Sequence, residues 1–128
     1  MPTQFHYETE AEDPPAPYLT ARLSNPSRPT VVADIRAKLD TGADITVIPE
    51  ALAKDLNLKV VNRIAAIGFD GVPQEKAVYA FRIELPNGVR GSTQCLTRDS
   101  DHVLLGRDVI NHLRLLLDGP AQSLEILE

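Results

Sequence analysis

The segment Asp-Thr-Gly-Ala-Asp at residues 40–44 carries the side chains best suited to chemistry in this 128-residue chain. It follows an apolar and β-branched run at 30–39 and precedes Thr-Val-Ile at 46–48. A carboxylate at the end of a buried strand, inside a glycine turn, is held by a rigid element yet open on one side, as a catalytic group must be. Asp40 is therefore the first catalytic candidate, with Thr41 and Gly42 in its turn.

Such a carboxylate needs a second one to hydrolyse an amide without a metal. Two carboxyl groups about 3 Å apart cannot both ionise cheaply, so they share one proton. The ionised group can take a proton from water while the protonated group polarises a peptide carbonyl. Because the chain holds one Asp-Thr-Gly segment, the second carboxylate would have to come from another copy of the chain.

The residues that follow Asp40 also suit a turn at an active site. Gly42 lets the backbone turn and lets a substrate strand come close, because it has no side chain. The hydroxyl of Thr41 can lock the turn by hydrogen bonding, and the small Ala43 keeps the floor of a cleft narrow.

Composition excludes several other functions. The net charge is −5 and the thirteen Lys and Arg residues are scattered, which argues against nucleic acid as a partner. No apolar run approaches the ~20 residues of a membrane span, so no membrane association is predicted. The lone Cys95 and the lack of a signal-like start favour a reducing cytoplasm. The three histidines lack metal-ligand spacing, and neither a metal nor a cofactor is predicted.

The chain divides into a tail and a domain. Residues 1–17 hold four acidic residues, no Lys or Arg, and Pro14, Pro15 and Pro17, which predicts a flexible tail. Residues 18–128 are long enough for one compact domain and too short for two.

Alternation and turn signals predict a mainly β domain with a closed, barrel-like sheet and one or two short helices. Strands are expected at 18–24, 30–39, 60–69, 76–85, 89–97, 101–105, 115–117 and 123–127, and helices at 49–56 and 107–113. The strands between 60 and 97 are separated by turn sequences, which predicts an antiparallel meander.

This pattern resembles the retropepsin-like aspartic proteases, the single-domain, homodimeric relatives of pepsin. The resemblance covers roughly residues 18–128 and rests on two motifs, 37–49 and Val-Leu-Leu-Gly-Arg-Asp at 103–108. It implies the acid-protease fold and an aspartic endopeptidase that cleaves polypeptides between two Asp40 residues of a homodimer. It also implies that Thr41 hydrogen bonds across the dimer and that Gly106 and Arg107 support the active loop.

The resemblance extends to the substrate cleft. It implies substrate contacts by Ala43, Asp44, Val47, Gly68, Phe69, Gly71, His102 and Leu104. The hairpin around 68–72 takes the place of the family's flap, and Asp44 would make a partly buried bidentate pair with Arg107. One departure from the family is Lys38, which stands where the retroviral enzymes usually have an apolar residue. Lys38 either faces the cleft, where it would favour acidic substrates, or points outward as a solvated group.

Other functions stay open on sequence alone. Asp-Thr-Gly is also an ordinary turn tripeptide, and the fold can serve as a noncatalytic dimerisation or peptide-binding module. A further possibility is that residues 1–17 are a propeptide that the protein itself removes.

Overall fold

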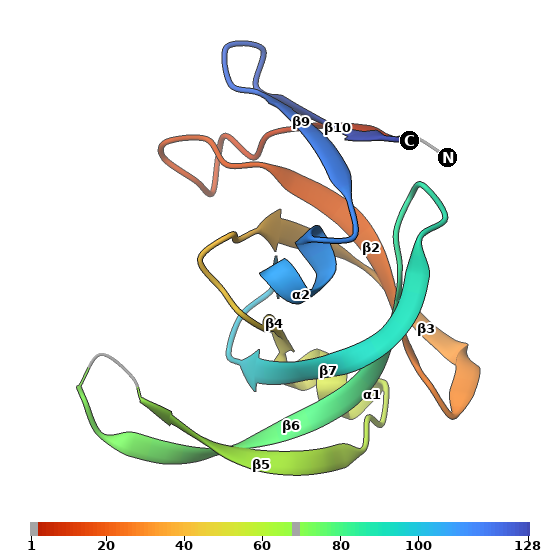
Figure 1. Ribbon diagram of the computed structural model, residues 1–128, viewed down its shortest axis with the longest axis vertical. Coiled ribbons are helices and arrows are strands. Elements are labelled where there is room, and N and C mark those ends of the chain that lie inside the picture. Colours follow the sequence, from red (N-terminus) through yellow and green to blue (C-terminus); the bar gives the residue numbers. More distant parts are fainter. Residues whose placement is uncertain (1–2, 68–69) are drawn as a thin grey trace.

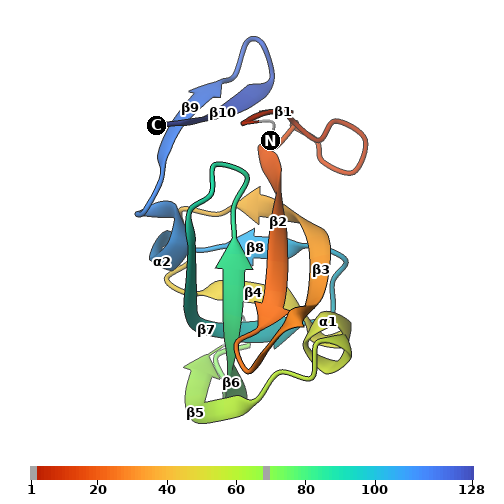
Figure 2. The ribbon, with the colours of Figure 1, turned by 90° about the vertical axis from the view of Figure 1, so that its right-hand side faces the viewer.

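A computed structural model describes residues 3–67 and 70–128 (Figures 1 and 2). In these ranges the strands are β1 (Gln4–His6), β2 (Tyr18–Asn25), β3 (Arg28–Leu39), β4 (Thr46–Pro49), β5 (Val60–Ile67), β6 (Pro73–Glu84), β7 (Arg90–Arg98), β8 (Val103–Leu105), β9 (Arg114–Asp118) and β10 (Ser123–Leu127). The helices are α1 (Glu50–Asp55) and α2 (Arg107–Ile110). The predicted mainly β class with two short helices is confirmed.

Most strands belong to one sheet of seven, in the order β2-β3-β8-β4-β7-β6-β5. This sheet curls back on itself, because β2 pairs with β6 as well as with β3. The predicted antiparallel meander is confirmed in β5, β6 and β7. A second sheet of order β1-β10-β9 lies beside the first, at the top of both views (Figures 1 and 2).

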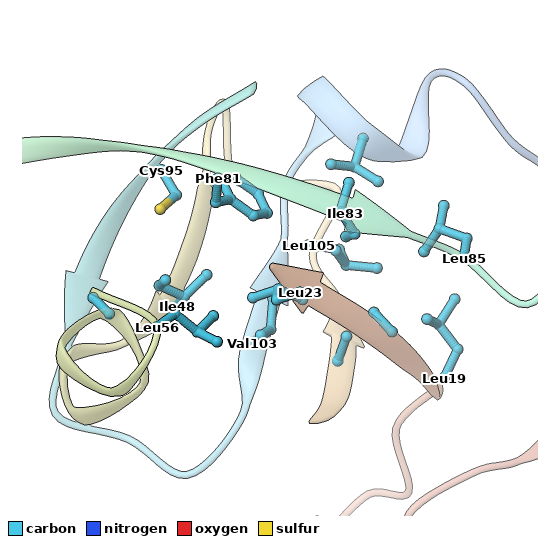
Figure 3. Close-up of a cluster of buried hydrophobic side chains, with 14 of the residues drawn as sticks. Leu19, Leu23, Ile48, Leu56, Phe81, Ile83, Leu85, Cys95, Val103 and Leu105 are labelled. Atoms are coloured by element: carbon cyan, nitrogen blue, oxygen red, sulfur yellow. The ribbon is translucent and has the colours of Figure 1, made fainter. Parts of the chain in front are cut away.

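The core fills the inside of the curled sheet. In β3 the odd-numbered residues from Val31 to Ala37 are partly or fully buried, whereas the even-numbered residues 32, 34 and 36 are exposed. Figure 3 shows the side chains of Leu23, Ile48, Val103 and Phe81, which come from four different strands, pointing into this core. In β3, therefore, residues on one face contribute to the core and those on the other face point away from it.

The amino-terminal segment differs from the predicted tail. Strand β1 pairs antiparallel with β10, and Glu8 bridges to Ala16 through two backbone hydrogen bonds of 2.8 and 3.1 Å. Glu8 also forms an ion pair with Arg36. The composition of residues 1–17 could not show this order, because the basic and apolar partners of the segment lie far away in the sequence.

Smaller differences concern element ends. Helix α2 ends at Ile110, three residues before the predicted end, and β8 begins at Val103 rather than at residue 101. Residues 46–49, for which the sequence pattern predicts no separate strand, form β4 between β7 and β8. In the part of the chain that the structure describes, no helix has the length and apolar character needed to span a membrane.

Candidate active site

Asp40 is the first residue after β3, and the backbone holds it in place. Its N–H donates to the carbonyl of Leu105 in β8 over 3.0 Å, and its own carbonyl accepts from the N–H of Ala43 over 3.1 Å. The N–H of Gly42 donates to Oδ1 of Asp40 over 3.0 Å. The turn therefore orients the carboxylate as well as the backbone, while Thr41 and Gly42 stay exposed.

The hydrogen bond between Gly42 and Asp40 leaves little space at position 42. A Cβ atom on Gly42 would lie 3.2 Å from Oδ1 of Asp40, closer than an ordinary van der Waals contact. Any larger side chain would push against the carboxylate that the turn orients.

A buried cluster of polar groups, formed by Thr46, Gly106 and Asp108, connects the segment after the turn to the start of α2. The hydroxyl of Thr46 donates to Oδ1 of Asp108 over 2.8 Å, and the Thr46 N–H donates to Oδ2 over 3.1 Å. The same hydroxyl accepts from the N–H of Gly106 over 3.1 Å. Thr46 is fully buried, so this cluster joins β4 to the start of α2 inside the protein. Sequence reasoning gave Thr46 and Asp108 no role, although a threonine within the run Ile-Thr-Val-Ile was a possible signal.

Gly106 allows the two predicted motifs to touch. A Cβ atom on Gly106 would lie 2.7 Å from the carbonyl carbon of Ile45 and 2.9 Å from its oxygen. Because those atoms are backbone, the close approach of the segments around Ile45 and Gly106 requires glycine. The predicted supporting role of Gly106 has this contact as its physical basis.

Arg107 links both ends of the Asp40 turn. One guanidinium nitrogen donates to the Thr41 carbonyl over 2.8 Å, and the other forms an ion pair with Asp44. The predicted pairing of Asp44 with Arg107 is therefore present, but it is not bidentate. The side chains are 46% and 85% exposed in the single chain, where such a pair stabilises by under about 1 kcal/mol.

Beside the turn, four residues form a row across the outer face of four strands. Cα pairing joins Val47 of β4 to Leu104 of β8, Leu104 to Lys38 of β3, and Lys38 to Tyr18 of β2. Their strand neighbours Ile48, Leu105, Ala37 and Leu19 lie in the core. We call these four residues the outer row, which lies on the face opposite the core, with Lys38 two residues before Asp40.

The predicted substrate residues fall at several places around this row. Val47 and Leu104 lie next to each other within it. His102 lies at its far end, where its ring meets that of Tyr18 edge-on at 5.4 Å. His102 also contacts Arg98 at 3.1 Å and Asp101 at 2.8 Å.

The predicted flap falls on the hairpin of β5 and β6. This hairpin projects on the same side of the molecule as the connection after β3, at the left of Figure 1. Gly71 is exposed and has a positive φ of 71°, which a turn residue without a side chain adopts easily. The predicted substrate contacts of Gly68 and Phe69 concern residues outside the described ranges.

The charged groups near the outer row shift one another's protonation. Hydrogen bonds from the Glu10 N–H and from Arg36 lower the pKa of Glu8 to about 2. Hydrogen bonds from Lys38 and Tyr18 lower the pKa of Glu12. Burial, together with the hydrogen bond to Glu12, raises the pKa of Tyr18 to about 12. Across residues 3–67 and 70–128, no three His, Cys, Asp or Glu side chains are grouped to hold a metal ion.

A curled β sheet that presents an Asp-Thr-Gly turn, backed by an apolar-apolar-Gly segment, defines the retropepsin class of aspartic protease fold. The family model described as "gag-polyprotein putative aspartyl protease" matches residues 32–112, more than half of the chain. The chain belongs to this family, which confirms the resemblance seen in the sequence. No curated protein matches it in a sequence comparison.

Solved structures share the fold at low sequence identity. A retropepsin-like aspartic protease from Rickettsia conorii is 13% identical with a TM-score of 0.63, over 96% of this chain and 89% of that one. The EIAV protease complexed with the inhibitor HBY-793 is 23% identical with a TM-score of 0.53, over 76% and 86%. The foamy viral protease-reverse transcriptase, solved with an RNA/DNA hybrid, is 19% identical with a TM-score of 0.58 over 77% of this chain. The match spans 12% of that longer chain.

Proposed function

We propose that this chain is an aspartic endopeptidase that acts as a homodimer, with one Asp40 from each copy. The observation that carries the proposal is the Asp40 turn, in a chain that belongs to this protease family. A backbone hydrogen bond to β8 holds Asp40 in place, and Thr41 and Gly42 beside it are exposed. Since the chain has one Asp-Thr-Gly segment, a pair of facing carboxylates requires two copies.

The proposed reaction needs only the two carboxyl groups and water. The ionised Asp40 takes a proton from a water molecule, which attacks the peptide carbonyl, while the protonated Asp40 donates a hydrogen bond to the carbonyl oxygen. The resulting tetrahedral intermediate collapses when the leaving nitrogen receives a proton. The Gly42 N–H keeps each carboxylate oriented during these steps, and Arg107 holds the turn between Thr41 and Asp44.

The substrate would be a polypeptide bound as an extended strand. Val47 and Leu104 offer it an apolar surface beside Asp40, and Ala43 and Asp44 lie on the turn itself. The hairpin of β5 and β6 would close over the bound strand and exclude water, with Gly71 in its turn.

The central test is the variant Asp40→Asn. An amide cannot take a proton from water, so we expect cleavage of a peptide library between about pH 4 and 7 to fall by more than about 10³-fold. Circular dichroism and sedimentation velocity should show unchanged folding and assembly.

Asp55→Asn is the matched control, because Asp55 is an exposed carboxylate in α1, and it should retain full activity. Full activity in Asp40→Asn would exclude the mechanism. Peptide binding by the wild-type protein without turnover at any pH would instead identify a noncatalytic binding module.

A further inference from the structure

One end of the outer row is covered by a carboxylate from the amino-terminal segment. The Nζ of Lys38 lies 2.8 Å from Oε2 of Glu12 and 2.9 Å from Oε1. The hydroxyl of Tyr18 donates to Oε2 over 2.6 Å. Lys38 therefore does not point freely into solvent, and its side chain is 31% exposed.

The surroundings of Glu12 leave room for a ligand. An open cavity of about 260 Å³ lies at this end of the row, lined by Ala11, Glu12, Tyr18, Arg36, Asp101 and His102. The guanidinium of Arg36 stacks on the Tyr18 ring at 4.5 Å and is paired with Glu8, so Lys38 is the cation that contacts Glu12. Lys38 and the Tyr18 hydroxyl together suit a carboxylate, and Glu12 already provides one.

The position of this carboxylate site relates it to the candidate active site. An extended peptide directs every second side chain to the same face. A peptide that passes Asp40 and lies along Val47 and Leu104 therefore directs a side chain toward Lys38, the next residue in the row. In this structure Glu12 is the group that contacts Lys38.

We propose that Lys38 and Tyr18 form a subsite for an acidic side chain of the substrate, and that Glu12 occupies this subsite in the free protein. The proposal deepens the proposed function and rests on it for the direction of the substrate. Because Glu12 belongs to the same chain, its effective concentration is high, and it competes with every acidic substrate residue.

Glu12 can leave without damage to the fold. It is bound through its side chain, and the neighbouring Glu10, Ala11 and Asp13 are exposed. The bridge between Glu8 and Ala16 closes this loop on itself, outside the seven-stranded sheet. Displacement of Glu12 therefore breaks side-chain contacts and leaves the sheet intact.

The test compares cleavage profiles of the full chain and its variants on a proteome-derived peptide library, read by mass spectrometry. In Glu12→Gln we expect the frequency of Glu and Asp among cleaved peptides to rise about fivefold over wild type, at one position within three residues of the cleaved bond. An ion pair that contributes about 1 kcal/mol gives this ratio. The double variant Glu12→Gln/Lys38→Met should lose this rise.

Glu10→Gln is the matched control, because it removes an exposed carboxylate two residues away in the same segment and leaves the contacts of Lys38 untouched. It should keep the wild-type profile. A profile in Glu12→Gln equal to wild type, or a rise that persists in the double variant, would overturn the proposal.

A binding experiment separates failure of this proposal from failure of the proposed protease activity. Two fluorescent pools of degenerate ten-residue peptides, identical except for a central Glu or Gln, are titrated against Asp40→Asn/Glu12→Gln and followed by anisotropy. We expect the Glu pool to bind about fivefold more tightly, for the same electrostatic reason. Equal binding of the two pools would exclude the acidic subsite even if no variant cleaves peptides.

Discussion

At the scale of single residues, Gly106 shows how little space separates the two motifs of the site. Its N–H donates to the buried Thr46 hydroxyl, and the next residue, Arg107, donates from its backbone N–H to the Ala43 carbonyl over 2.8 Å. Both bonds require the chain at Gly106 to lie against the backbone of Ile45. The Asp40 turn is thus held by backbone contacts that a methyl group added at Gly106 would disturb.

We expect Gly106→Ala to lower the free energy of unfolding by about 1–3 kcal/mol, as overpacked substitutions do. The added Cβ would meet the Ile45 carbonyl at 2.7–2.9 Å, and the backbone must shift to accept it. Thermal and urea denaturation measure the effect. Gly91→Ala is the control, since an added Cβ there has nothing within 4 Å; an equal midpoint for both variants would contradict the argument.

Residue types predicted the centre of the site better than its supports. Asp40, Thr41 and Gly42 are adjacent in the chain, so their joint turn was readable from local sequence. The hydrogen bonds between Thr46 and Asp108 join residues 62 positions apart, which local sequence does not reveal. The orientation of Lys38 depended in the same way on Glu12, 26 positions away.

At the scale of elements, the segment between β1 and β2 is attached to β3 by ionised carboxylates. The pKa of Glu8 is lowered to about 2, first by the Glu10 N–H and then by Arg36. A carboxyl group whose pKa is lowered in the folded state stabilises that state above its ordinary pKa. The contribution is lost as the pH falls toward the folded value.

We therefore expect the contacts of Glu8 to persist at pH 5 and to be lost as the pH falls from about 4.5 toward 2. The chemical shift of the Glu10 amide proton, which donates to Glu8 over 3.0 Å, reports this step by NMR. Glu8→Gln should remove the step. A titration midpoint for Glu8 near its ordinary value would show that the segment is not bound as described.

Elements built from local alternation were predicted well, and those that depend on distant partners were not. The strands near 18–24 and 30–39 follow from their own pattern and match β2 and β3. Strand β1 was missed because its partner β10 begins at residue 123, and three residues carry too little pattern to indicate a strand. The predicted tip of the flap includes residues 68 and 69, which lie outside the described ranges, so it stays a prediction.

At the scale of the whole molecule, a single Asp40 turn makes the proposed activity depend on concentration. One chain supplies one Asp40, so the proposed protease would form by association of two copies. Arg107 and Asp44 are exposed in the single chain, close to the turn that would meet its counterpart in the proposed dimer.

We expect specific activity to fall in proportion to protein concentration once dilution passes the dimer dissociation constant. Serial dilution assays, compared with sedimentation velocity at the same concentrations, measure this. Two copies joined in one chain by a flexible linker are the matched control and should keep constant specific activity. An unlinked chain that keeps its specific activity where it sediments as a monomer would contradict the dimer.

The pairing of β1 with β10 also has a mechanical consequence. Gln4 lies opposite Glu125 in an antiparallel ladder, and the N–H of Ile126 donates to the carbonyl of Thr3, so both chain ends leave from the same end of the ladder (Figure 1). Tension applied to the two ends would unzip these hydrogen bonds one after another rather than shear them together. Pulling would therefore peel β1 away at low force before the seven-stranded sheet carried any load.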